Sequence, residues 1–216
     1  MNPRLFTEDQ FPLEFRPLVP PALKTAYRAV DDLLADNPIL DMAVKRGERG
    51  RLVAWSVDFA FNRLVESGAL PFDKSWEYFE RPTGRYLALR PSHSVITVSQ
   101  IVDPTKQPRN VLFRKNKRLS NQPFLDLAEF SNNEEISGEP HILLTHGHRK
   151  LNFSHLCVPD PDHKKGYRFR SENLLHLPHE VKAEGPPPED TDIDLDELAT
   201  LKEEIERHRR DNDSDQ

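Results

Sequence analysis

Apolar residues recur at helical spacing in two segments of the first third of the chain. In residues 22–35 they share one side of a helix, and Pro20-Pro21 suits the helix start: Leu23, Tyr27, Val30 and Leu34. In residues 51–67 the apolar surface is broader: Leu52, Val53, Trp55, Val57, Phe59, Ala60 and Leu64. This pattern predicts two helices, of which the second lies buried at the centre of a helical layer.

The pattern changes after residue 72 to short runs rich in β-branched and aromatic residues. These runs are bounded by Pro or Gly, as is typical of strands, and cover residues 85–90, 94–102, 110–114, 141–146, 151–158 and 166–171. The runs on either side of Gly147 predict a hairpin. Helices followed by strands favour an α+β fold, with an N-terminal helical layer packed on an antiparallel β-sheet.

Both ends of the chain differ from this middle part, which we interpret as a single α+β domain over residues 22–180. Residues 1–21 contain five prolines and three phenylalanines, and predict an extended arm whose rings dock on the domain. Residues 181–216 predict a Pro-rich linker and a short acidic helix, largely disordered. Three apolar residues of that helix are the expected partner-binding positions: Leu198, Leu201 and Ile205.

Composition narrows the class of protein. The 216 residues include no run near the roughly 20 apolar residues that span a bilayer, and the first residues lack the apolar core of a signal peptide. The single cysteine, Cys157, excludes a disulfide framework and a multi-cysteine zinc site. With 8 glycines and no glycine-rich phosphate loop, the sequence predicts a cytoplasmic protein without a bound cofactor and without a membrane partner.

The net charge of −6 is unevenly distributed. Residues 181–216 carry 5 Lys/Arg against 13 Asp/Glu, whereas residues 81–120 carry nine basic residues against Asp103 alone. The basic residues nearest one another are the candidate nucleic-acid contacts: Arg109, Arg114, Lys115, Lys117 and Arg118. Phe113 or Tyr86 would stack on a base, and the alternative is a solvated turn.

Histidines gather between residues 141 and 179, where seven of the 9 lie. His146, His148 and His155 are the weak catalytic candidates, as acid–base groups of a small nuclease or other phosphodiester hydrolase. That hypothesis requires at least two of them to converge in a cleft lined by Arg109, Arg114 or Lys117. Together with Cys157 they also resemble a transition-metal ligand set. However, a turn at Gly147 would direct His146 and His148 away from each other. The sequence therefore predicts no metal site.

No catalytic constellation in the sequence is stronger than these histidines. We therefore expect a non-catalytic intracellular binding or regulatory protein, which engages a protein partner or nucleic acid through the basic strand region and the acidic tail helix. The His-dependent hydrolase is the alternative hypothesis.

Overall fold

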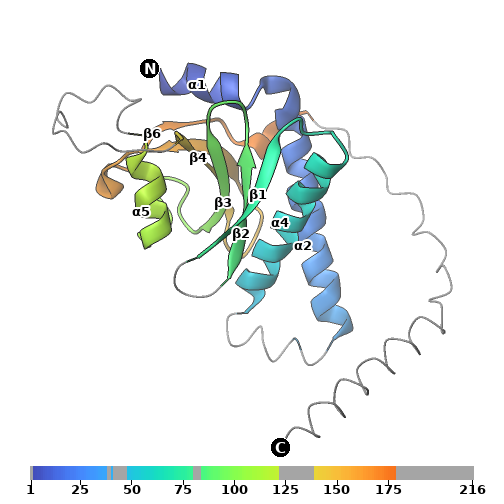
Figure 1. Cartoon of the computed structure of the whole chain (residues 1–216). Helices are drawn as coiled ribbons and strands as arrows, with labels where there is room; N and C mark the ends of the chain where they lie inside the picture. Colours follow the sequence, from blue (N-terminus) through green and yellow to red (C-terminus); the bar gives the residue numbers. More distant parts are fainter. Residues whose placement is uncertain (1, 38–39, 41–47, 80–83, 122–138, 179–216) are drawn as a thin grey trace, which may run out of the picture. The chain divides into compact units, whose positions relative to one another are not determined.

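The computed structural model describes residues 2–37, 40, 48–79, 84–121 and 139–178 (Figure 1). Within this part of the chain four α-helices and short 3₁₀ helices surround one β-sheet. The α-helices are α1 (Pro3–Gln10), α2 (Val19–Asp36), α4 (Arg49–Glu66) and α5 (Leu112–Leu119). The 3₁₀ helices are η1 (Leu13–Leu18), η4 (His163–Lys165) and η5 (Leu174–His176). The expected acidic helix of residues 181–216 lies outside the described residues.

The sheet confirms the α+β class but is mixed. Its strands lie in sequence order: β1 (Asp73–Tyr78), β2 (Arg85–Arg90), β3 (Val95–Ile101), β4 (His141–Gly147), β5 (Ser154–Pro159) and β6 (Tyr167–Arg170). β3 and β4 run parallel, with Val95 opposite His141, and all other neighbours are antiparallel. The expectation of a fully antiparallel sheet is wrong at this one pair. A parallel pair needs a long crossover, and α5 lies in the connection from β3 to β4.

The predicted hairpin and edge strand are confirmed. β4 and β5 pair antiparallel, with His146 opposite Ser154, and the chain turns between Gly147 and Ser154. β6 covers Tyr167–Arg170 at one end of the sheet.

The N-terminal segment is helical, which corrects the extended arm expected for residues 1–21. The side-chain Oδ1 of Asn2 accepts hydrogen bonds from the backbone N–H groups of Arg4 and Leu5 and so caps α1. Pro3 occupies the first turn, where its missing N–H costs no hydrogen bond. The expected docking of the rings is confirmed, since Phe6 and Phe11 are buried and Phe15 packs against the same core.

The two predicted helices pack together over one face of the sheet, but α4 is not buried on all sides. Val53, Val57 and Phe61 face the core at helical spacing. Trp55 and Phe59 face outward and remain 63% and 58% exposed. The expectation of a central, fully surrounded helix is therefore wrong for this side of α4.

α5 covers the opposite face of the sheet from α2 and α4 (Figure 1). The ring of Phe113 lies 5.0 Å from that of Tyr86 on β2 and 4.9 Å from that of Phe79. The strand expected over residues 110–114 is wrong, because α5 begins at Leu112. Phe113 alone supplies the aromatic contact with the sheet, and the charged residues that follow it favour a helix. None of the described helices is long and apolar enough to cross a membrane.

Candidate functional site

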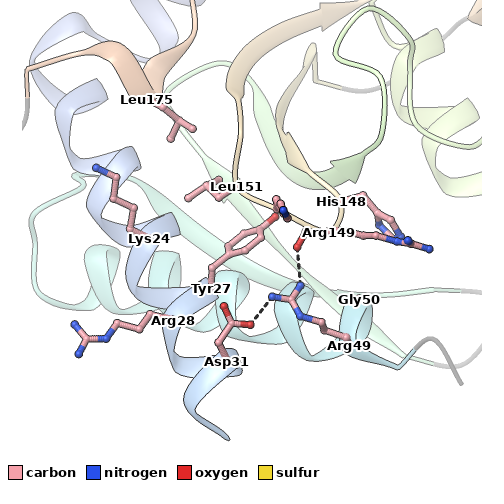
Figure 2. Close-up of a pocket in the computed structure, with 11 residues that line it drawn as sticks. Lys24, Tyr27, Arg28, Asp31, Arg49, Gly50, His148, Arg149, Leu151 and Leu175 are labelled. Atoms are coloured by element: carbon pink, nitrogen blue, oxygen red, sulfur yellow. Dashed lines mark hydrogen bonds and ion pairs between the residues drawn. The ribbon is translucent and has the colours of Figure 1, made fainter. Parts of the chain in front are cut away.

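A cleft of about 940 Å³ opens between α2, the start of α4 and the turn that follows β4 (Figure 2). Five cationic side chains line it, from three segments far apart in the sequence: Lys24, Arg28, Arg49, Arg149 and Lys150. Among the described lining residues, Asp31 is the one carboxylate. Tertiary packing therefore concentrates positive charge that the sequence spreads over more than a hundred residues.

The α2 side of the cleft follows from helical spacing. Lys24, Arg28 and Asp31 stand about one turn apart and are exposed, whereas Tyr27 between them points inward and is buried. Arg28 lies 3.7 Å from Asp32 in an exposed ion pair. Such exposed pairs are weak, so the Arg28 guanidinium stays available to an anion.

Arg49, at the start of α4, holds the three walls together. Its Nη2 lies 2.5 Å from Oδ1 of Asp31 on α2, and its Nη1 donates to the backbone carbonyl of Arg149 at 2.9 Å (Figure 2). Asp31 is thereby already paired. No other carboxylate among the described residues lines the cleft, and the local potential is positive.

The turn after β4 supplies two further exposed cations. His148, Arg149 and Lys150 are exposed consecutive residues, and no described carboxylate forms an ion pair with Arg149 or Lys150. A Cβ at Gly147 would overlap the carbonyl oxygen of Lys150 and the side chain of Asn152. The tight fold of this turn, which presents the two cations, therefore depends on glycine at position 147.

Tyr27 lines the cleft, and the buried side chain of His146 lies against it. The Tyr27 hydroxyl donates its proton to the carbonyl of Gly147. The phenol oxygen also lies 2.7 Å from Nδ1 of His146. Because the hydroxyl proton is already used, Nδ1 must be the donor in this second contact and carries the ring proton. Burial lowers the pKa of His146 to about 3. At neutral pH the imidazole ring of His146 is therefore uncharged. It supports Tyr27 and is not positioned to exchange protons with a ligand.

The structure does not bring the three candidate histidines together. His146 faces the helices, whereas His155 projects from the other face of the sheet, where its Nδ1 lies 2.9 Å from the carbonyl of Ser171. His148 lies at the cleft, away from Arg109 and Arg114. The geometric condition of the hydrolase hypothesis is therefore not met. Cys157 lies on the same face of the sheet as His155 and on the opposite face from His146, so these side chains do not form one ligand set. No group of three metal-ligating side chains occurs among the described residues.

The basic residues predicted to contact nucleic acid lie on and before α5, where internal contacts hold several of them. Arg118 is buried and donates from Nε to the carbonyl of Pro161, and Lys117 lies 2.9 Å from Glu77. The Arg114 side chain is largely packed against the sheet. Arg109 and Lys115 are exposed. The expected basic strand region is therefore a loop and a helix, with one exposed cation before α5, Arg109, and one on it, Lys115.

Sequence reasoning named one residue of the cleft, His148, but none of its five cations. The i, i+4 spacing of Lys24 and Arg28 and the consecutive pair Arg149-Lys150 were visible signals. Their meeting depends on the pairing of β3 with β4 and the packing of α2 on α4, which charge counts along the chain do not reveal. The expected partner-binding residues Leu198, Leu201 and Ile205 lie outside the described residues.

Comparisons of the chain with models of known protein families, with curated proteins and with solved structures found no match. The cleft itself is therefore the basis for a proposed function.

Proposed function

We propose that the protein is a non-catalytic intracellular binding protein whose basic cleft holds the phosphate backbone of a nucleic acid. The observation that carries the proposal is that five Lys/Arg side chains from three segments line one cleft, whose single described carboxylate is already paired. Phosphate contacts of this kind supply most of the affinity of nucleic-acid binding that is independent of sequence.

The shape of the cleft fits an extended polyanion. It is open to solvent, and its cations come from both sides: Lys24 and Arg28 from α2, and Arg149 from the opposing turn (Figure 2). Lys150 follows Arg149 in the same turn and also lines the cleft. Leu151 and Leu175 add apolar surface against which a sugar or base can lie. Each neutralised phosphate releases counterions, so binding weakens as salt increases.

The non-catalytic part of the proposal rests on the histidines. His146 is buried and neutral, and His155 projects from the other face of the sheet. His148 alone among the three lines the cleft. One exposed histidine beside cations can contact a phosphate or a base. Acid–base cleavage, by contrast, needs a second group positioned to take or give the other proton.

The test is a fluorescence-anisotropy titration of labelled single-stranded and double-stranded oligonucleotides at several salt concentrations. The double substitution Arg149→Gln and Lys150→Gln should weaken binding of both at least tenfold at low salt. The matched control, Arg109→Gln with Lys115→Gln, removes two exposed cations outside the cleft and should weaken binding less than threefold. Absence of salt-sensitive binding by both the full chain and residues 1–180 would reject nucleic acid as the ligand.

The truncated chain is included because of the charge of the tail. Residues 181–216 carry an excess of eight acidic residues, and their negative field opposes a polyanion. We expect residues 1–180 to bind oligonucleotides more tightly than the full chain at low salt. The difference should shrink as salt screens the tail.

The outward side of α4 supports a second candidate function, binding of a protein partner. Trp55 and Phe59 are exposed one turn apart, with Arg51 and Arg63 one further turn away on either side. Trp and Arg are enriched among residues that dominate protein interfaces. A partner that binds this face should lose affinity for the variant with Trp55→Ser and Phe59→Ser and keep it for Leu112→Ser, an exposed apolar residue on α5. Equal loss in both variants would contradict this candidate.

A further inference from the structure

The outer edge of β1 is open. β1 is the last strand at its end of the sheet, and among the described residues β2 alone pairs with it. Just beyond β1, the backbone N–H of Phe79 donates to the carbonyl of Gly84. Hydrogen-bonded and non-hydrogen-bonded pairs alternate along antiparallel strands, so the odd-numbered residues of β1 bond to β2. The backbone groups of the even-numbered residues therefore face the open edge: Lys74, Trp76 and Tyr78.

The charged side chains of β1 identify its two faces. Lys74 lies 2.6 Å from Glu66 on α4, whereas Glu77 lies 2.9 Å from Lys117 on α5. Side chains alternate between the two faces of a strand. The even-numbered side chains of β1 therefore lie on the α4 side of the sheet and the odd-numbered ones on the α5 side.

β1 lacks the features that usually protect an edge strand. It contains no proline and no bulge, and its charged residues Lys74 and Glu77 are engaged within the chain. Trp76 and Tyr78 remain 37% and 76% exposed. At the other end of the sheet β6 is shorter, and α1 lies against it. An open edge that carries exposed aromatic rings is a template for a further strand.

α4 extends this surface beside β1. Asn62 and Glu66 of α4 both accept hydrogen bonds from Lys74. Trp55 and Phe59 stand on the same stripe of the helix, because positions 55, 59, 62 and 66 follow the spacing i, i+4, i+7 and i+11. The exposed rings of Trp55 and Phe59 therefore belong to the stripe of α4 that contacts β1.

We propose that a second copy of this chain pairs with β1 in antiparallel orientation, so that two six-stranded sheets join into one across a two-fold axis. The second copy is the occupant that β1 itself fits, because a two-fold interface must be complementary to itself. The pairing does not depend on nucleic-acid binding. It rests on the second candidate function only in assigning Trp55 and Phe59 to the same interface.

The charges of β1 select one register for this pairing. In the register centred on Ser75, Asp73 would oppose Glu77 of the second copy, and in the register centred on Glu77 the two Glu77 carboxylates would meet. In the register centred on Trp76 no like charges are opposed. Lys74 lies opposite Tyr78, and the two Trp76 rings lie opposite each other. This register also forms three hydrogen-bonded pairs within β1, where each of the others forms two.

The first test is analytical ultracentrifugation of the full chain without nucleic acid, from micromolar to millimolar concentration. We expect the mass of two chains at the upper end. Tyr78→Pro removes an N–H that faces the open edge and leaves the bonds to β2 intact, so it should weaken association about tenfold or more. Tyr78→Phe is the matched control and should associate like the wild type. A mass of one chain throughout, or equal association of the folded Tyr78→Pro variant, would overturn the proposal.

The second test traps the register by disulfide formation. In Trp76→Cys the two thiols oppose each other in a hydrogen-bonded pair, whose Cα atoms lie about 5.5 Å apart, within reach of a disulfide. In the control Ser75→Cys each thiol faces Glu77 instead, and the native Cys157 is buried. Mild oxidation should link Trp76→Cys about tenfold or more faster than Ser75→Cys. Equal rates, or faster linking of Ser75→Cys, would contradict the register. Both tests change β1 alone, so their failure would leave the proposed functions of the cleft and of α4 untouched.

Discussion

The phenol oxygen of Tyr27 on α2 lies 2.7 Å from Nδ1 of His146 on β4, a contact that joins residues 119 positions apart. The same hydroxyl donates to the carbonyl of Gly147, where the strand gives way to the turn that carries Arg149 and Lys150. One side chain therefore fixes the distance between the helical wall of the basic cleft and its opposing turn. The phenol is buried, which raises the pKa of Tyr27 and keeps its proton in place.

Removing the hydroxyl in Tyr27→Phe should destabilise the fold by about 1–3 kcal/mol, because Nδ1–H of His146 and the Gly147 carbonyl are both left without a buried partner. Urea denaturation followed by circular dichroism measures this destabilisation. The control is Tyr78→Phe on β1, where the side chain is 76% exposed and no change above about 0.5 kcal/mol is expected. Similar destabilisation of both variants would show that the buried hydrogen bonds of the Tyr27 hydroxyl contribute no more to stability than an exposed hydroxyl does.

Glycine is required at position 147 and not at position 50. A methyl group at Gly147 overlaps the Lys150 carbonyl, so Gly147→Ala should cost more than about 2 kcal/mol or displace the turn. At Gly50 the nearest atom to an added Cβ is Cε1 of His148 at 3.4 Å, an ordinary contact. Gly50→Ala lies in the first turn of α4 and should be neutral or stabilise the fold by up to about 1 kcal/mol. Thermal melts of the two variants compare these outcomes directly.

Asp58 on α4 makes stability fall as the pH rises towards neutral. Burial raises its pKa to about 7, although the backbone N–H of Leu87 favours the charged form, and its ordinary value is 3.8. Between these values the folded chain holds a proton that the unfolded chain has released, so this contribution to stability is lost as the pH increases. Asp58→Asn should therefore raise the free energy of unfolding at pH 8 by roughly 1–3 kcal/mol. At pH 4 the gain should vanish, and an equal gain at both values would refute the titration.

The buried histidines act in the opposite direction. The pKa values of His146 and His141 are lowered to about 3 from an ordinary value of 6.5. Below pH 6.5 the unfolded chain binds protons that the folded chain excludes, so stability is lost as the pH falls towards 3. In the Asp58→Asn background each histidine should contribute a slope of up to about 1.4 kcal/mol per pH unit. Denaturant titrations at pH 6.5, 5.5 and 4.5 measure the slope, and a flat profile would show that the rings are accessible to protons.

Much of the fold could be predicted because local patterns determine it. The apolar spacing around Leu23 and Val57 indicated two helices, and the runs around Gly147 indicated a hairpin. The prediction for residues 1–21 was wrong because proline disrupts a helix interior but not a first turn, where Pro3 stands. The prediction for residues 110–114 was wrong because one apolar cluster around Phe113 fits a strand or a helix equally well.

The candidate site could not be predicted in the same way. The largest local excess of basic residues lies in residues 81–120, yet Arg118 and Lys117 are engaged by Pro161 and Glu77. The cleft instead draws Lys24, Arg49 and Arg149 together through helix packing and strand pairing. Those interactions are non-local, so neither charge counts nor motif spacing anticipates them.

The salt dependence of oligonucleotide binding tests the central claim most directly. A plot of log K against log salt concentration should fall linearly for the wild type. Replacing Arg149 and Lys150 by Gln should reduce the slope by about 0.7–0.9 for each phosphate that the variant no longer neutralises. The variant with Arg109→Gln and Lys115→Gln should keep the wild-type slope. A slope that is unchanged in the cleft variant, or reduced only in the variant with Arg109→Gln and Lys115→Gln, would contradict the assignment of the cleft as the nucleic-acid site.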